Sequence, residues 1–131
     1  MSQLPLIAVI DDDGAMRDAL SELLQVAGLA VMSFGGAAEF LAQGAKHRFD
    51  AVVTDIRMPR IDGIELIRKL RQRGGEAPIL VLTACSEPDL RARAFAAGAV
   101  DVLTKPVVDS DLIGRIEDML RLTRRSELPG R

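Results

Sequence analysis

Short apolar runs alternate with longer amphipathic stretches along this chain. Each run has four or five residues, mostly Val, Ile, Leu and Ala. Such runs are too short for an ordinary helix and are typical of strands that are covered on both faces. They predict five strands, at Leu6–Ile10, Ala30–Phe34, Ala51–Thr54, Ile79–Leu82 and Val100–Leu103.

The stretches between these runs have the periodicity of helices. Apolar residues spaced by three or four positions place one face of each stretch against a core, while glycines and capping residues mark the ends. The first predicted helix has Met16, Leu20, Leu23, Leu24 and Ala27 on its inner face and ends at Gly28, and the second is at Ala37–Ala42. The third has Ile64, Ile67 and Leu70 on its inner face and ends at Gly74–Gly75, and the fourth begins at Ser86 and Asp89 and ends at Gly98. The fifth is capped by Asp109 or Ser110, and its inner face is Leu112, Ile113, Ile116, Met119 and Leu120. This strict alternation predicts an α/β fold, a five-stranded parallel doubly wound sheet with helices on both faces.

Length and composition narrow the class of protein. A chain of 131 residues suits a single domain, and we expect residues 1–122 to form it. Residues 123–131 lack periodicity and contain Pro129–Gly130, so we expect a tail or a linker to an absent output domain. Because 48% of residues are apolar and 27% charged, without a signal pattern or a run able to span a membrane, we expect a soluble cytoplasmic protein.

Charge and cysteine content exclude some functions. A net charge of −2 argues against direct nucleic-acid binding by this domain. The lone cysteine, Cys85, excludes an intrachain disulfide and a multi-cysteine metal site. His47 has no partner at metal-ligand spacing and is expected to be a solvated loop residue.

Polar residues follow the predicted strands where those strands end. Asp11–Asp13 follow the first strand, Asp55 the third, Thr83 the fourth and Lys105 the fifth. Taken singly, each is typical of a turn, a helix cap or a solvated end. In a parallel sheet, however, they meet at one rim, where adjacent carboxylates repel one another unless a cation lies among them. The set suits Mg²⁺ and a phosphoryl group, with a carboxylate as the acceptor.

The motifs at this rim give a family resemblance that extends from about Leu6 to Leu122. They are Val9–Asp13, Val52–Pro59 with Asp62–Gly63, Leu82–Ala84, Ala97–Asp101 and Lys105–Pro106. In this order and spacing, they resemble a two-component response-regulator receiver domain, closest in look to the nitrogen-fixation and nitrate-response transcription regulators. The resemblance implies a flavodoxin-like fold with strand order 2-1-3-4-5.

The resemblance also implies a role for each rim residue. Asp55 matches the aspartate that is phosphorylated by a histidine kinase or a phosphotransfer protein. Asp11, Asp12, Asp55 and the backbone carbonyl of Arg57 match the Mg²⁺ ligands. Thr83 and Lys105 match the hydroxyl and the cation that engage the phosphoryl group, and a cis peptide is implied between Lys105 and Pro106. Asp13 matches a variable position and is expected to be a helix N-cap. The protein would then be no enzyme, assisting only its own phosphorylation and dephosphorylation.

Signalling in the family commonly uses the face made by the fourth helix, fifth strand and fifth helix. Mixed charges there suit a homodimer, and they come from Arg91, Arg93, Arg115, Glu117, Asp118 and Arg121. The chain departs from the family at Val102, where many receivers carry a Tyr or Phe that moves with the threonine. The usual coupling of Thr83 to a ring therefore cannot operate.

Several outputs and one other chemistry stay open. The chain is expected to regulate transcription through a missing domain, or to act as a stand-alone or phosphorelay receiver that binds a protein. A degenerate receiver without phosphotransfer is a further alternative. A small Mg²⁺-dependent phosphohydrolase would use Asp11 as its nucleophile, although Ala15 and the length of the chain weigh against it.

Overall fold

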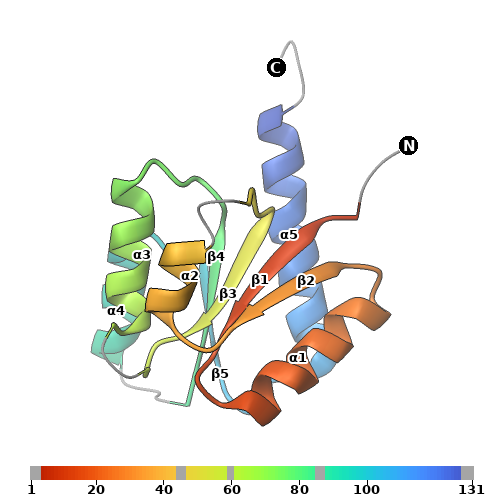
Figure 1. The fold of residues 1–131 in the computed structure, drawn as a ribbon, viewed down its shortest axis with the longest axis horizontal. Coiled ribbons are helices and arrows are strands. Elements are labelled where there is room, and N and C mark those ends of the chain that lie inside the picture. Colours follow the sequence, from red (N-terminus) through yellow and green to blue (C-terminus); the bar gives the residue numbers. More distant parts are fainter. Residues whose placement is uncertain (1–3, 44–46, 59–60, 85–87, 128–131) are drawn as a thin grey trace.

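The structure is a computed structural model that describes residues 4–43, 47–58, 61–84 and 88–127, the last five of these as backbone only. Strands and helices alternate strictly within those residues (Figure 1). In chain order they are β1 (Leu6–Ile10), α1 (Gly14–Val26), β2 (Ala30–Phe34), α2 (Ala37–Gln43), β3 (Ala51–Asp55), α3 (Gly63–Gln72), β4 (Ile79–Thr83), α4 (Pro88–Ala97), β5 (Asp101–Thr104) and α5 (Asp109–Glu127).

The five strands form one parallel sheet in the order β2-β1-β3-β4-β5. Helices α1 and α5 cover one face, and α2, α3 and α4 cover the other (Figure 1). The predicted fold class and strand order are therefore confirmed.

Each strand contributes to two separate cores because successive side chains point to opposite faces of a sheet. In β1, Ile7 and Val9 join the core under α1 and α5, whereas Ala8 and Ile10 join the core under α2, α3 and α4. Both cores need apolar side chains, which explains why the strands read as continuous apolar runs.

Aspartates begin two of the helices, as N-cap preferences favour. Asp13 Oδ1 accepts hydrogen bonds from the backbone N–H groups of Ala15 and Met16, at 3.0 and 3.3 Å. Asp62 Oδ1 accepts one from Glu65 N–H, at 2.8 Å. The prediction that Asp13 is a helix cap is thus confirmed.

Some predicted boundaries differ from the structure. Strands β3 and β4 each run one residue further, to Asp55 and Thr83, and β5 is shifted by one residue toward the C-terminus. Helix α5 already includes Asp109, so neither Asp109 nor Ser110 is its cap. It continues to Glu127, five residues past Leu122, where the apolar periodicity of the sequence ends. A linker role for residues 123–131 stays a prediction. The predicted cap Ser86 lies outside the described residues.

Phe95 in α4 is 41% exposed. The inward positions of α4 are Leu90 and Ala94, one helical turn apart, so the next residue faces outward. Among the described residues, no helix is both long enough and apolar enough to cross a membrane.

Candidate functional site

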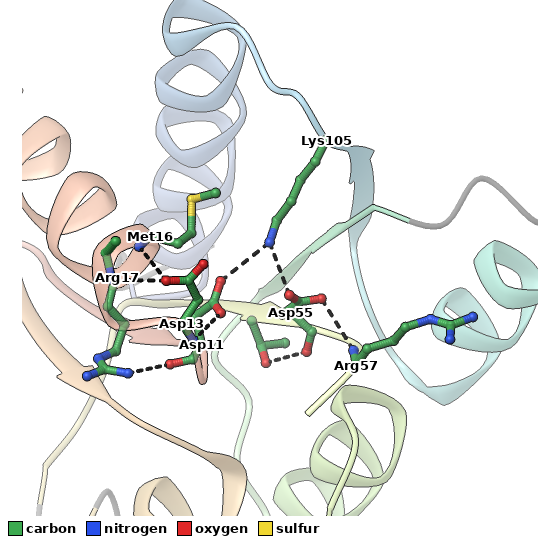
Figure 2. A network of polar contacts seen from close by, with 9 residues as sticks. Asp11, Asp13, Met16, Arg17, Asp55, Arg57 and Lys105 are labelled. Carbon is green, nitrogen blue, oxygen red and sulfur yellow. Dashed lines mark hydrogen bonds and ion pairs between the residues drawn. The ribbon is translucent and has the colours of Figure 1, made fainter. Parts of the chain in front are cut away.

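Three of the predicted rim residues, Asp11, Asp55 and Lys105, meet at the carboxyl ends of the strands (Figure 2). Asp11 follows β1, Asp55 ends β3 and Thr83 ends β4, while Lys105 follows β5. Neighbouring strands place these ends side by side, with Asp55 paired to Leu82 and Thr83 to Thr104. The parallel topology therefore collects groups that are up to 94 positions apart in the sequence.

Lys105 connects the buried Asp11 to the half-buried Asp55. Its Nζ lies 3.0 Å from Asp55 Oδ2 and 3.4 Å from Asp11 Oδ2. Burial alone would lower the pKa of the Lys105 ammonium, but the hydrogen bond and charge of Asp55, together with Asp11, outweigh burial and raise it. Lys105 N–H also donates to Thr83 O at 2.8 Å, and the Lys105–Pro106 peptide is cis, as the resemblance implies.

Asp11 is a buried carboxylate, with 3% of its surface exposed. Burial raises its pKa, and the negative charge of Asp55 raises it further, although the Asp13 backbone N–H and Lys105 oppose the rise. The raised pKa means that the negative charge on Asp11 is only partly compensated by its protein neighbours. A further cation near Asp11 would stabilise that charge.

Asp12 and Asp55 complete a group of carboxylates that fits a divalent cation. One oxygen from each of Asp11, Asp12 and Asp55 can be chosen so that all lie within 4.8 Å of one another. Asp12 is exposed and Asp55 half-buried, so the group faces solvent on one side. Mg²⁺ prefers one or two carboxylates together with water and phosphate oxygens. The donor set and its open side therefore suit this ion.

The loop after Asp55 is held close to α3. Asp55 Oδ1 accepts a hydrogen bond from Arg57 N–H at 3.3 Å, while the Arg57 side chain is exposed. Gly63 N–H donates to Ile56 O at 2.7 Å. A Cβ at position 63 would lie 2.4 Å from Asp55 O, so only glycine permits this approach. The glycine of Asp62–Gly63 therefore lets the start of α3 pack closely against the backbone of Asp55.

Thr83 is buried at the end of β4, next to the Lys105 backbone. Val102 is also buried, and its carbonyl accepts a hydrogen bond from Arg91 Nη1 at 2.8 Å. His47 is exposed, as expected, and its ring lies beside Phe49. Cys85 lies outside the described residues.

Sequence reasoning missed Arg17 as a neighbour of the site. Its Nη1 donates to Asp11 O at 2.8 Å (Figure 2). The sequence carries a weak signal at most, because an arginine on the first turns of a helix is usually solvated.

Comparison with known proteins decides the family. Residues 7–117 match the response regulator receiver domain. This chain belongs to the response regulator receiver family. It is 44% identical to the transcriptional regulatory protein FixJ of Bradyrhizobium diazoefficiens, over 88% of this chain and 56% of FixJ. It is 42% identical to the response regulator MprA of a Mycobacterium strain, over 94% of this chain and 54% of MprA.

A solved structure agrees with these matches. The full-length FixJ structure from B. japonicum superimposes with a TM-score of 0.88 at 40% identity, covering 96% of this chain and 62% of that one. The predicted family, and its likeness to transcription regulators, are therefore confirmed. The receiver chain spans about half the length of the curated relatives it matches.

Proposed function

We propose that this receiver domain takes a phosphoryl group onto Asp55 from a sensor histidine kinase, or from a phosphotransfer protein, and later loses it to water. The observation that carries the proposal is the position of the Lys105 ammonium, between Asp55 Oδ2 and Asp11 Oδ2. A cation there stabilises the negative charge that builds up on phosphoryl oxygens during transfer.

The transfer would proceed in two steps. In the first, a carboxylate oxygen of Asp55 attacks the phosphorus of a phosphohistidine. A P–O bond forms, the P–N bond breaks, and the imidazole nitrogen leaves with the electron pair and takes a proton from solvent. In the second, water attacks the phosphorus, which releases inorganic phosphate and a proton and restores the Asp55 carboxylate. Lys105 and the Thr83 hydroxyl would bind phosphoryl oxygens in the intermediate state.

The metal requirement belongs to the same proposal. Mg²⁺ held by Asp11, Asp12, Asp55 and the Arg57 backbone carbonyl would neutralise phosphoryl charge. The compact carboxylate group supports this assignment.

Phosphorylation is proposed to act on the face made by α4, β5 and α5. A doubly charged group beside Thr83 and Lys105 would shift the equilibrium between two pre-existing arrangements of that face. Phe95 and Val100 are 41% and 42% exposed there, and Val108 before α5 is 62% exposed. Arg115 pairs with Asp101 within the same chain. Exposed apolar side chains beside charged ones support a homodimer or a protein partner at this face.

The output is proposed to be regulation of transcription, as the names of the FixJ relatives suggest. A stand-alone or phosphorelay receiver, with a protein target and no DNA output, is the alternative. Because the chain matches only part of its relatives, an output domain in the whole protein belongs to the proposal as well.

The test is the mass of the intact protein after incubation with acetyl phosphate, with Mg²⁺ or with EDTA. We expect one added phosphoryl group that requires Mg²⁺ and is absent from Asp55→Asn. Labelling at Asp11 would instead identify the phosphohydrolase chemistry. Failure with both acetyl phosphate and the kinase would favour a binding module. Size-exclusion chromatography of the labelled protein then separates a dimer from a monomeric output.

A further inference from the structure

Arg17 bonds the backbone that carries the first two acidic residues of the cluster. It lies on α1, and its side chain turns back toward the connection between β1 and α1 (Figure 2). Its Nη1 donates to the carbonyl oxygen of Asp11 at 2.8 Å. That carbonyl belongs to the peptide unit that joins Asp11 to Asp12, and a peptide unit is planar. Fixing the carbonyl therefore also fixes the direction in which the chain enters Asp12.

The other polar groups of Asp11 are bonded by three different segments. Its N–H donates to Phe34 O at 3.2 Å. Its Oδ1 accepts from Asp13 N–H at 3.0 Å, and its Oδ2 lies 3.4 Å from Lys105 Nζ. Arg17 completes this set from a fourth direction. The Asp12 side chain is exposed. The position of its carboxylate therefore depends on the backbone that precedes it.

Two glycines border the guanidinium of Arg17. A Cβ at Gly14 would lie 3.5 Å from Arg17 Nη2, and one at Gly35 would lie 3.6 Å from Nη1. Gly35 is itself tied to α2, because its N–H donates to Glu39 Oε2 at 3.0 Å. The head group thus lies between the turn after β1 and the turn after β2.

We propose that Arg17 is a positioning residue for the cation site, holding the Asp11–Asp12 peptide so that both carboxylates face one ion. The inference rests on the proposed function in taking this acidic group as the Mg²⁺ site. The positive charge of Arg17 and its hydrogen bond to the Asp11 carbonyl would have opposite effects on Mg²⁺ affinity. As a cation near the site, Arg17 repels Mg²⁺, so its removal would tighten binding if charge were its main effect. If position dominates, its removal weakens binding.

The experiment measures Mg²⁺ dissociation constants by NMR titration of the backbone amides of residues 12 and 13. The variants are Arg17→Met, which keeps the aliphatic stem, and Arg17→Lys, which keeps the charge and one donor. Arg68→Met is the control, since it removes the same charge from an exposed position on α3. Thermal unfolding in EDTA reports the stability of each variant separately.

We expect Arg17→Met to bind Mg²⁺ about tenfold more weakly than the unsubstituted chain, as for other groups that orient metal ligands. Arg17→Lys should recover part of the affinity, and Arg68→Met should bind normally. Tighter or unchanged binding by Arg17→Met would overturn the inference, even if its melting temperature fell. An unsubstituted chain that shows no Mg²⁺ binding would instead reject the proposed metal site itself.

Discussion

Helices α3 and α4 each have ten residues and cover the same face of the sheet, yet they are anchored differently (Figure 1). Helix α3 follows Asp55 and buries Gly63, Ile64, Leu66 and Ile67. Helix α4 follows Thr83 and buries only Leu90 and Ala94. Elements with little buried apolar surface are the ones that shift at low free-energy cost.

This contrast separates the two halves of the site. The proposed acceptor, Asp55, leads into a helix whose apolar side chains fix its position. Thr83 ends β4, and residues 84–87 connect it in sequence to α4, a helix that is held by few apolar side chains. Chemistry at the acceptor needs fixed geometry, whereas signalling needs an element with two arrangements. The difference in burial supports α4 as the part of the proposed output face that responds to phosphorylation.

The largest expected effect comes from truncating the anchors of the two helices. Ile67 is fully buried and Leu90 lies near the edge of the same core. We expect Ile67→Ala to lower the free energy of unfolding by about 3–5 kcal/mol, and Leu90→Ala by about 2 kcal/mol, because the cavity at Leu90 is open to collapse. Urea denaturation measures both. Equal losses would remove the distinction between the helices.

A smaller loss is expected where α3 meets the loop after Asp55. Gly63→Ala places a Cβ 2.4 Å from the Asp55 carbonyl oxygen, so the backbone must move. We expect about 2–3 kcal/mol of destabilisation, and slower labelling of Asp55 by acetyl phosphate. Gly114→Ala in α5 is the matched control. Its Cβ meets nothing within 4 Å, so it should stabilise the helix by about 0.5–1 kcal/mol. Normal labelling of Gly63→Ala would show that the close approach does not position the acceptor.

The end of α4 is tied to α3 by one arginine. Arg71 Nη1 donates to Gly75 O and Ala77 O, both at 2.9 Å, and Nη2 donates to Gly98 O at 3.2 Å. Gly98, which has a φ of 126°, directly follows α4. We expect Arg71→Met to cost about 1–2 kcal/mol and to speed amide hydrogen exchange in the last turn of α4. Arg68→Met, on the exposed face of α3, should change neither. Unchanged exchange in Arg71→Met would mean that packing alone holds this end.

Much of the fold could be predicted because it is encoded locally. The apolar runs of β1 to β5 identify strands covered on both faces, and Asp13 precedes its helix as a capping residue should. The candidate site followed from topology, since parallel strands bring Asp11, Asp55 and Lys105 to one rim. The role of each site residue, for Asp55 and Lys105 as for Thr83 and the Arg57 carbonyl, stays a prediction.

The side-chain contacts that sequence reasoning missed share one property. Arg17, Arg71 and Arg91 all donate to backbone carbonyls, at Asp11, at Gly75, Ala77 and Gly98, and at Val102. A carbonyl has no residue type, so no pair of letters in the sequence marks such a contact. The position of an arginine along a helix does not indicate whether its guanidinium bonds a distant carbonyl or is solvated. Only the folded arrangement distinguishes them.

Arg91 provides the finest test of the contrast between α3 and α4. It connects α4 to β5 at Val102, where the ring common in the family is replaced by a smaller side chain. Its Nη1 donates to Val102 O at 2.8 Å, and its guanidinium carbon lies 5.7 Å from the centre of the Phe95 ring. A hydrogen bond and a half-exposed cation–π contact together contribute about 1 kcal/mol.

We therefore expect Arg91→Met to lower the free energy of unfolding by about 1 kcal/mol. Because the substitution loosens α4 from β5, it should also alter the changes in amide chemical shift that Phe95 and Val100 show on phosphorylation. Arg93→Met removes the same charge from an exposed position two residues along α4 and should leave those shifts unaltered. If both variants responded to phosphorylation as the unsubstituted chain does, Arg91 would only stabilise the fold, and the weak apolar anchoring of α4 alone would have to account for any movement at this face.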